Sequence, residues 1–193
     1  MPPRPFEDRS DLLFIGSFQH EPNLDAAHHL VEEILPRVAE RIDARVILLG
    51  SDPPPEVRRL QSPSVIVPGY LPNVDEYFRQ ARVFVAPLRY GAGMKGKVGH
   101  ALAFGLPVVT TPIGAEGMEL ADGVHALIRE DTDEFADAVV ALYRNRDLWT
   151  RIADEGREVV WERWSPAAMR ARLKSVLDDV VPASRSTSEV PVR

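Results

Sequence analysis

Cysteine is absent from this sequence of 193 residues, and its absence excludes several classes of protein. A chain without cysteine has no disulfide framework, no cysteine-ligated zinc or iron–sulfur centre and no thiol nucleophile. Long hydrophobic runs are also missing, since no stretch reaches the length of about 18 apolar residues that spans a membrane. The amino-terminal residues MPPRPFEDRSD contain no apolar signal-peptide core. We therefore expect a cytoplasmic protein with no transmembrane segment.

Acidic residues are missing from one long window of the chain. The whole sequence has 23 Lys and Arg against 29 Asp and Glu, a net charge of −6, so nucleic acid is not an expected partner. Residues 77–115 nevertheless contain basic side chains and no acidic one. The basic residues are Arg79, Arg82, Arg89, Lys95 and Lys97. A cationic window in an acidic chain suggests an anionic small ligand.

Apolar segments alternate with helical patterns along the chain. The hydrophobic share of 45% is enough to bury the core of one α/β domain. Most of the strand candidates are continuous apolar runs, which are typical of strands buried on both faces of a parallel sheet. The helices between them indicate a three-layer, doubly wound arrangement, in which ligands bind beyond the carboxyl ends of the strands. Strands are predicted at residues 11–16, 45–50, 64–67, 82–88, 107–110 and 125–129.

Polar residues at three positions are predicted to cap helices. They are Asn23, Asp131 and Ser165, the last of which precedes a proline at the first helical position. Pro36 is expected to kink or restart the first helix. Residues 1–10 are interpreted as a linker remnant, 11–181 as one domain and 182–193 as a disordered tail. Helices are predicted at residues 24–35, 56–61, 74–80, 98–104, 132–143, 148–161 and 166–181.

A glycine-rich loop, GAGMKGK at residues 91–97, matches two phosphate-binding patterns. Its three glycines fit the dinucleotide fingerprint G-x-G-x-x-G, and Glu116 follows the third by twenty residues. In that fingerprint, however, the acid ends the next strand, whereas the next predicted strand here ends in Thr110. This difference argues against a dehydrogenase.

The same loop also fits the P-loop pattern G-x-x-x-x-G-K. Val98 stands where a P-loop has the Ser or Thr that holds magnesium, which argues against a nucleotide hydrolase. What both patterns share is physical: glycines let the backbone approach a phosphate, and the amides that begin the next helix point at it. Lys95 and Lys97 add positive charge. The loop therefore predicts a phosphate-binding site.

Three segments, taken together, resemble a known family. In their order and spacing they resemble the C-terminal, nucleotide-sugar-binding domain of retaining GT-B-fold glycosyltransferases, the glycosyl transferases group 1 family. The resemblance runs from residue 12 to residue 177 and implies the Rossmann-like half of a GT-B fold. The segments are FIGSFQHEPNLDAA at 14–27, VPGYLPNVDEYFRQARVFVAPL at 67–88 and PLRYGAGMKGKVGHALAFGLPVVTTPIGAEGM at 87–118.

The resemblance implies roles for two groups of residues near the donor phosphates. One group lies under the donor diphosphate, and the other wraps the diphosphate and the donor sugar. No metal is expected, because lysines and helix amides neutralise the diphosphate. The first group is Gly16 and Ser17, and the second is Gly93, Met94, Lys95, Gly96 and Lys97.

The resemblance also implies contacts to the rest of a UDP- or GDP-linked sugar. A backbone segment reads the nucleotide base, one residue faces the ribose and a loop after the following strand lies near the sugar. The base segment is Gly69, Tyr70 and Leu71, the ribose residue is His100, and the sugar loop holds Glu116 and Gly117.

Two departures from the family pattern leave alternatives open. Members commonly have two glutamates separated by seven residues, but here the first position falls near Ala92–Gly93 and the second is His100. Members also have an N-terminal Rossmann-like domain that binds the acceptor, so we expect this chain to be an excised or truncated domain that is inactive alone. A nucleotide-sugar epimerase half and a non-enzymatic nucleotide-sugar-binding or interaction domain remain alternatives.

Overall fold

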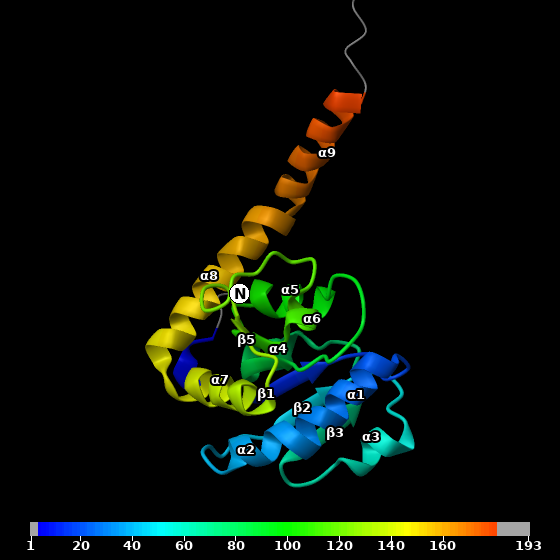
Figure 1. The fold of residues 1–193 in the computed structure, drawn as a ribbon, viewed down its shortest axis with the longest axis vertical. Coiled ribbons are helices and arrows are strands. Elements are labelled where there is room, and N and C mark those ends of the chain that lie inside the picture. The colour runs from blue at the N-terminus through cyan, green and yellow to red at the C-terminus, as the bar shows by residue number, and fades with distance from the viewer. Residues whose placement is uncertain (1–3, 181–193) are drawn as a thin grey trace, which may run out of the picture.

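Six parallel strands form the centre of the computed structural model, which describes residues 4–180 (Figure 1). Their order in the sheet is β3-β2-β1-β4-β5-β6, so the chain winds outward from β1 in one direction and then restarts beside β1 at β4. The predicted doubly wound parallel sheet is therefore confirmed. The strands are β1 (Ser10–Ile15), β2 (Val46–Leu49), β3 (Val65–Gly69), β4 (Ala81–Ala86), β5 (Val108–Thr110) and β6 (Leu127–Ile128).

Helices cover both faces of the sheet. The described helices are α1 (Glu21–His29), α2 (Leu35–Ala39), α3 (Pro55–Arg59), α4 (Asp75–Gln80), α5 (Gly96–Ala103), α6 (Pro112–Ala115), α7 (Thr132–Arg144), α8 (Arg146–Trp164) and α9 (Pro166–Val180), with a 3-10 turn η1 (Phe6–Asp8) and a π-helical turn η2 (Leu30–Ile34). α9 leaves the body of the domain as an extension of α8 (Figure 1). No helix among the described residues is long and apolar enough to cross a membrane.

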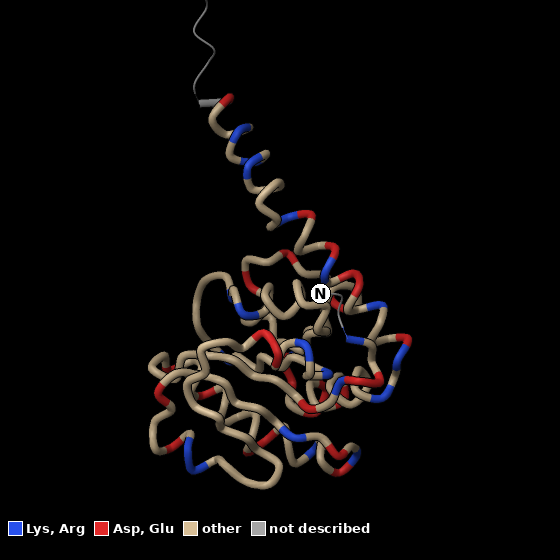
Figure 2. The backbone as a smooth tube through the Cα atoms, turned by 180° about the vertical axis from the view of Figure 1, so that it is seen from behind, with Lys and Arg blue, Asp and Glu red and all other residues tan. Residues whose placement is uncertain are grey.

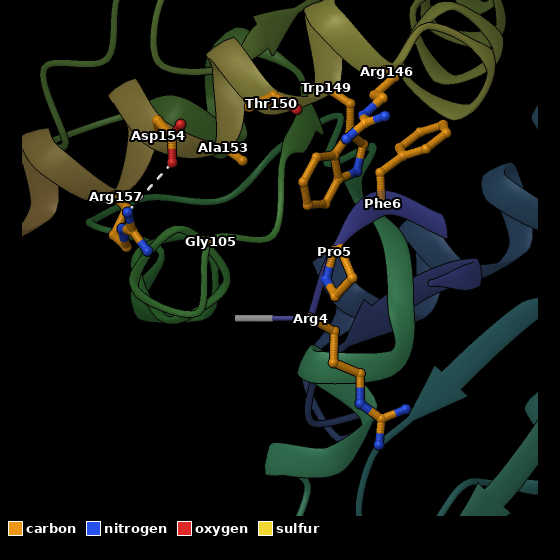
Figure 3. Close-up of a pocket in the computed structure, with 10 residues that line it drawn as sticks. All are labelled: Arg4, Pro5, Phe6, Gly105, Arg146, Trp149, Thr150, Ala153, Asp154 and Arg157. Carbon is orange, nitrogen blue, oxygen red and sulfur yellow. Dashed lines mark hydrogen bonds and ion pairs between the residues drawn. The ribbon is translucent and has the colours of Figure 1, made fainter. Parts of the chain in front are cut away.

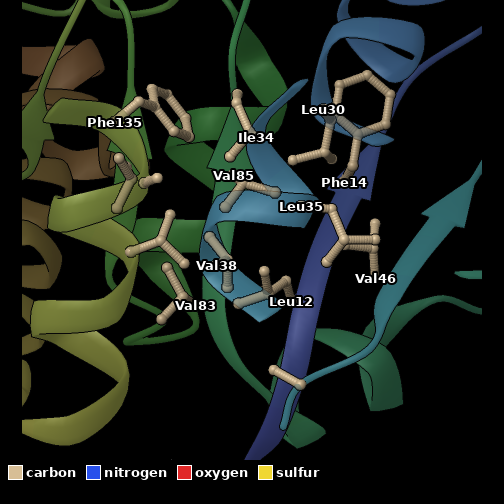
Figure 4. Close-up of a cluster of buried hydrophobic side chains, with 14 of the residues drawn as sticks. Leu12, Phe14, Leu30, Ile34, Leu35, Val38, Val46, Val83, Val85 and Phe135 are labelled. Atoms are coloured by element: carbon tan, nitrogen blue, oxygen red, sulfur yellow. The ribbon is translucent and has the colours of Figure 1, made fainter. Parts of the chain in front are cut away.

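Alternate residues of each central strand enter two separate cores. Leu12 and Phe14 of β1 pack with the helices α1, α2 and α7 on one face (Figure 4). Leu13 lies between them in sequence and packs on the opposite face, with Phe78 of α4 and Leu102 of α5. Buried apolar side chains cover both faces of the sheet, which explains why the strand sequences are uninterrupted apolar runs.

The cap predictions have mixed outcomes. The carboxylate of Asp131 accepts hydrogen bonds from the backbone N–H groups of Asp133 and Glu134 at the start of α7, and the Ser165 hydroxyl accepts one from Ala168, so both caps are confirmed. The prediction for Asn23 is wrong, because α1 begins two residues earlier, at Glu21.

The proline prediction is confirmed as a restart of the helix, because α2 begins at Leu35 with Pro36 in its first turn. Pro36 has no N–H to donate, so the helix passes through the π-helical turn η2 before it. The Leu35 N–H then donates to the carbonyl of Leu30, five residues back. The short helix α6 was not expected from the sequence, and the Thr111 hydroxyl caps it by accepting from Gly114.

Residues 4–10, which the sequence assigned to a linker, pack on the domain in the structure. The ring of Phe6 meets the Trp149 indole edge-on, with centroids 5.8 Å apart. Arg9 is fully buried. The predicted disordered tail at 182–193 lies outside the described residues.

Candidate functional site

An open cavity of about 590 Å³ lies where the strand order reverses, at the carboxyl ends of β1 and β4. One wall is the loop that follows β1, and the other is the glycine-rich loop that leads from β4 into α5. This is the position at which doubly wound sheets bind their ligands. Polar and loop residues that line it include Gly16, Ser17, His20, Asn23, Gly91, Ala92, Met94, Lys95, Gly96 and Lys97.

A second cavity of about 250 Å³ adjoins the first and shares three lining residues with it: Ile15, Gly16 and Ser17. Its other walls come from the carboxyl ends of β2 and β3, including the segment of Gly69, Tyr70 and Leu71. The Tyr70 side chain is 72% exposed at the rim. Together the two cavities form one groove along the carboxyl ends of β1, β2, β3 and β4.

The glycine-rich loop enters the groove through an unusual backbone path. Gly91 has a φ of 119° and Gly93 a φ of 82°, values that side-chain-bearing residues rarely adopt. The loop then starts α5, whose first turn has no acidic residue and whose N-cap, Lys95, makes no side-chain cap bond. Because the first N–H groups of a helix have no intrahelical acceptor, this end of α5 favours an anion.

Lys97 is the most perturbed cation of the groove. Its ammonium donates a hydrogen bond to the Asn23 side-chain oxygen and lies 5.0 Å from the centroid of the Phe14 ring. None of the ion pairs found between residues 4 and 180 includes it. Burial, with a smaller contribution from the charge of Lys95, lowers the pKa of Lys97 to about 8. The site thus holds a cation that lacks a countercharge.

Lys95 lies beside Lys97 and already has a carboxylate partner. Its ammonium donates to the Gly93 carbonyl and lies 3.5 Å from a Glu116 carboxylate oxygen. Gly117 packs against Met94 in the same region. The structure therefore brings the predicted sugar loop and the predicted diphosphate loop together, although Glu116 and Gly117 lie outside the set that lines the main cavity.

Asn23 connects the two walls of the main cavity. Its amide nitrogen donates to the Ser17 carbonyl at 2.9 Å, while its oxygen accepts from Lys97. A Cβ placed on Gly16 would lie 2.8 Å from the Asn23 side chain, so the residue after β1 must be glycine for Asn23 to fit. Sequence reasoning missed this role, since an asparagine before a helical pattern is also a common cap.

His100 is exposed and is not among the residues that line either cavity. It is on α5, and its ring centroid is 4.4 Å from that of Phe78 and 5.0 Å from that of Phe104. These contacts place the imidazole in an aromatic cluster next to α4. The ribose contact that the family resemblance implies for His100 stays a prediction.

Arg89, a further cation of the acid-free window, is engaged elsewhere. Its guanidinium donates to both carboxylate oxygens of Asp25, one of them at 2.9 Å. The hydrogen bond from Arg89 holds the pKa of Asp25 below its usual value. Figure 2 shows that basic and acidic positions are interspersed along most of the backbone. The two lysines, rather than Arg89, supply the charge of the groove.

Another cavity, of about 250 Å³, lies near the amino ends of the strands, between the segment before β1 and helix α8 (Figure 3). Three arginines line it, and each pairs with a carboxylate: Arg4 with Glu76, Arg146 with Glu7 and Arg157 with Asp154. Much of the remaining lining is apolar, as the Phe6 and Trp149 rings in Figure 3 illustrate. This cavity is a poorer anion site than the groove at the carboxyl ends.

The fold and the groove define a Rossmann-like α/β domain with a lysine-lined cleft at its switch point. A family model described as glycosyl transferases group 1 matches residues 9–145. The chain belongs to that family, and it forms a Rossmann-like half of the GT-B fold. Among curated proteins it is 32% identical over 98 residues to a Bacillus subtilis (strain 168) protein with the provisional name teichuronic acid biosynthesis glycosyltransferase TuaC.

Solved structures support the fold assignment. S. aureus TarM, in a complex that includes UDP, has a TM-score of 0.76 at 17% identity over 90% of this chain and 36% of its own. Anabaena HepE, solved with UDP and glucose, has a TM-score of 0.71 at 12% identity over 90% of this chain and 49% of its own. The C-terminal domain of the Francisella tularensis group 1 protein LpcC has a TM-score of 0.63 at 15% identity, over 86% of this chain and 89% of that domain.

These comparisons also fix how much of a relative the chain represents. The match to TuaC spans 49% of this chain and 25% of the relative, and TarM and HepE are covered to half their length or less. Only the isolated LpcC domain is covered almost completely among the three structures described.

Proposed function

We propose that this domain binds the nucleotide-diphosphate sugar donor of a retaining glycosyltransferase. The observation that carries the proposal is the groove at the β1–β4 switch point, with two lysines and the amino end of α5 on one side and a segment suited to a nucleoside on the other. UDP bound to TarM and HepE, which share the fold, supports a UDP-linked donor.

The main cavity takes the diphosphate and the sugar in this proposal. Lys95 and Lys97 neutralise the two phosphates, and the backbone of residues 93–97 approaches them closely, so no divalent metal is needed. Gly16 and Ser17 form the floor between the two cavities. Glu116 accepts a hydrogen bond from a sugar hydroxyl, with Gly117 leaving room beside it. In this arrangement leaving-group charge is stabilised by preorganised donors.

The second cavity takes the nucleoside. The backbone of Gly69, Tyr70 and Leu71 reads the edge of the base, and Tyr70 has an exposed ring at the rim for contact with it. His100 faces the ribose, which requires its ring to leave the contacts with Phe78 and Phe104. Sugar transfer additionally needs an acceptor-binding domain, because the chemistry depends on positioning two substrates. The isolated chain is therefore inactive in transfer.

Calorimetric titration with UDP and GDP in the presence of EDTA tests the proposal. Binding of one nucleotide at about millimolar affinity, roughly 4 kcal/mol, is expected for an open half-cleft. The double variant Lys95→Ala/Lys97→Ala is expected to lose binding. Arg170→Ala/Lys174→Ala removes the same charge from α9 and serves as the matched control. Binding by the Lys95/Lys97 variant equal to that of the parent would overturn the assignment.

A second candidate function is binding of the nucleotide sugar without transfer. The observation that favours it is the replacement of both family glutamates, with His100 packed among aromatic rings. This candidate predicts donor binding, but no transfer or hydrolysis of the donor even when an acceptor-binding domain is supplied. Detectable turnover in that reconstituted system would eliminate it.

A further inference from the structure

Asn23, in the first turn of α1, makes three side-chain contacts. Its amide nitrogen donates to the Ser17 carbonyl, its side chain fills the space that glycine leaves at position 16, and its oxygen accepts from the Lys97 ammonium. The first two contacts hold the amide group in a fixed orientation on the β1 side of the cavity. The third reaches across the cavity to α5.

The Lys97 side chain needs such a partner because its surroundings offer little else. The Phe14 ring lies under the ammonium at 5.0 Å, and the other charged or titratable groups around it are Lys95 on the same turn, Glu116 beyond Lys95, and His20 on the opposite wall. Lys95 repels it, and Glu116 pairs with Lys95. The polar contact that α1 makes with the Lys97 ammonium is therefore a neutral acceptor, the side-chain oxygen of Asn23.

We propose that Asn23 is a positioning residue, whose amide holds the Lys97 ammonium in the groove with its charge uncompensated and available to an anionic ligand. This inference rests on the proposed function, because the anion is the donor diphosphate. An aspartate at the same position would have the same shape but would neutralise Lys97 and repel a phosphate. An alanine would leave the lysine without its tether.

The small number of lysines in the chain allows the contact between Asn23 and Lys97 to be tested by NMR titration of the lysine side chains. The sequence has only three lysines, Lys95, Lys97 and Lys174, so a protein with ¹³C-labelled lysine gives three side-chain NMR signals to titrate. Lys174 on α9 is exposed and serves as the internal reference. In Asn23→Asp we expect Lys97 to titrate about one pH unit or more higher than in the parent. Asn73→Asp adds the same charge at an exposed loop and is expected to leave Lys97 unchanged.

Binding of UDP supplies the second readout. The affinity of the parent is expected to fall as the pH rises from 8 to 10, since Lys97 loses its proton in the free protein. Asn23→Asp is expected to bind UDP at least about tenfold more weakly at pH 7, and its loss of affinity with rising pH is expected to shift upward together with the titration of Lys97. Asn23→Ala is expected to weaken binding about fivefold, and it provides an independent variant if the aspartate disturbs folding.

The outcomes separate the positioning role from the proposed function. If Lys97 titrates at the same pH in Asn23→Asp as in the parent, or if both asparagine variants bind UDP with the parent's affinity and pH profile, the positioning role is overturned and donor binding stands. If the parent binds neither UDP nor GDP at millimolar concentration, the proposed function fails, and the role of Asn23 in ligand binding fails with it.

Discussion

Two cations lie at opposite ends of the same sheet, Arg9 buried and Lys97 half-buried, and their surroundings differ. Near the amino ends of the strands, Arg9 donates to four backbone carbonyls, those of Arg4, Phe78, Ala81 and Phe104, at 2.9 to 3.4 Å. Near the carboxyl ends, Lys97 has the Asn23 oxygen as its hydrogen-bond acceptor. Burial lowers the pKa of both, that of Arg9 to about 10 and that of Lys97 to about 8.

The difference separates a structural charge from one suited to a ligand. Arg9 joins the ends of α4 and α5 to the start of β4, and its donors are used within the domain. The Lys97 ammonium lies on the wall of an open cavity, where it donates one hydrogen bond and has no carboxylate partner among the described residues. An unsatisfied buried charge destabilises a fold, so its presence in a cleft is a reasonable sign of function.

The largest effect is expected at the amino end. Arg9→Met keeps much of the side-chain volume but leaves buried carbonyls without donors, and we expect a loss of roughly 3–4 kcal/mol in the free energy of unfolding. Urea denaturation measures it. The affinity for UDP should change less than about twofold, because Arg9 lies far from the groove. Arg4→Met, which breaks a surface ion pair, is the control and should cost below about 1 kcal/mol. A loss at Arg9 no larger than that of the control would contradict the comparison.

Substitution of Lys97, at the carboxyl ends of the strands, is expected to stabilise the protein, the opposite of the effect at Arg9. Lys97→Met removes an ammonium group whose pKa is lowered from 10.5 to about 8. It also removes the hydrogen bond that the Asn23 side-chain oxygen accepts from Lys97. The relief of burying the charge is larger than the loss of the hydrogen bond, so we expect the free energy of unfolding to rise by about 2 kcal/mol at pH 7. The same substitution should weaken UDP binding about tenfold or more. Destabilisation by Lys97→Met would mean that the charge is compensated within the fold.

The pH dependence of stability sharpens the same comparison. Below pH 8 the lysine is protonated in both the folded and the unfolded chain, so the full penalty of burying the charge is present. Between pH 8 and 10.5 the folded protein releases its proton first, and the penalty fades as the pH rises. The stability gap between Lys97→Met and the parent should therefore narrow across that window. If denaturation experiments from pH 7 to 10 gave a constant difference in stability between Lys97→Met and the parent, the predicted pH dependence would be wrong.

The smallest effect is expected at Lys95, which already pairs with Glu116. Lys95→Met should change stability by less than about 1 kcal/mol and weaken UDP binding about threefold, less than Lys97→Met does. Glu116→Gln frees the Lys95 charge and is the matched variant, expected to bind the diphosphate of UDP at least as tightly as the parent. Calorimetric titration with UDP ranks Lys95→Met, Lys97→Met and Glu116→Gln by their affinity for the nucleotide. A larger effect at Lys95 than at Lys97 would reverse the assignment of the two roles.

Much of the fold could be predicted from the sequence because local patterns and burial agree. The apolar runs around Leu13, Leu48 and Phe84 became central strands with both faces covered, and Asp131 and Ser165 cap the helices that follow them. Boundaries were less predictable. Asn23 looked like a cap, yet its bonds to Ser17 and Lys97 compete with that role.

The sequence alone determined the layers, the glycine-rich loop and the charge imbalance around it, since each depends on residue types at short spacing. The pairing of the charges was decided by tertiary structure. Arg89 and Lys97 belong to the same acid-free window, but the fold brings Asp25 to the first and only the neutral Asn23 to the second. Which cation stays uncompensated depends on residues more than 60 positions away. Short-range patterns carry no information about such contacts, because they form only when the walls of the groove meet.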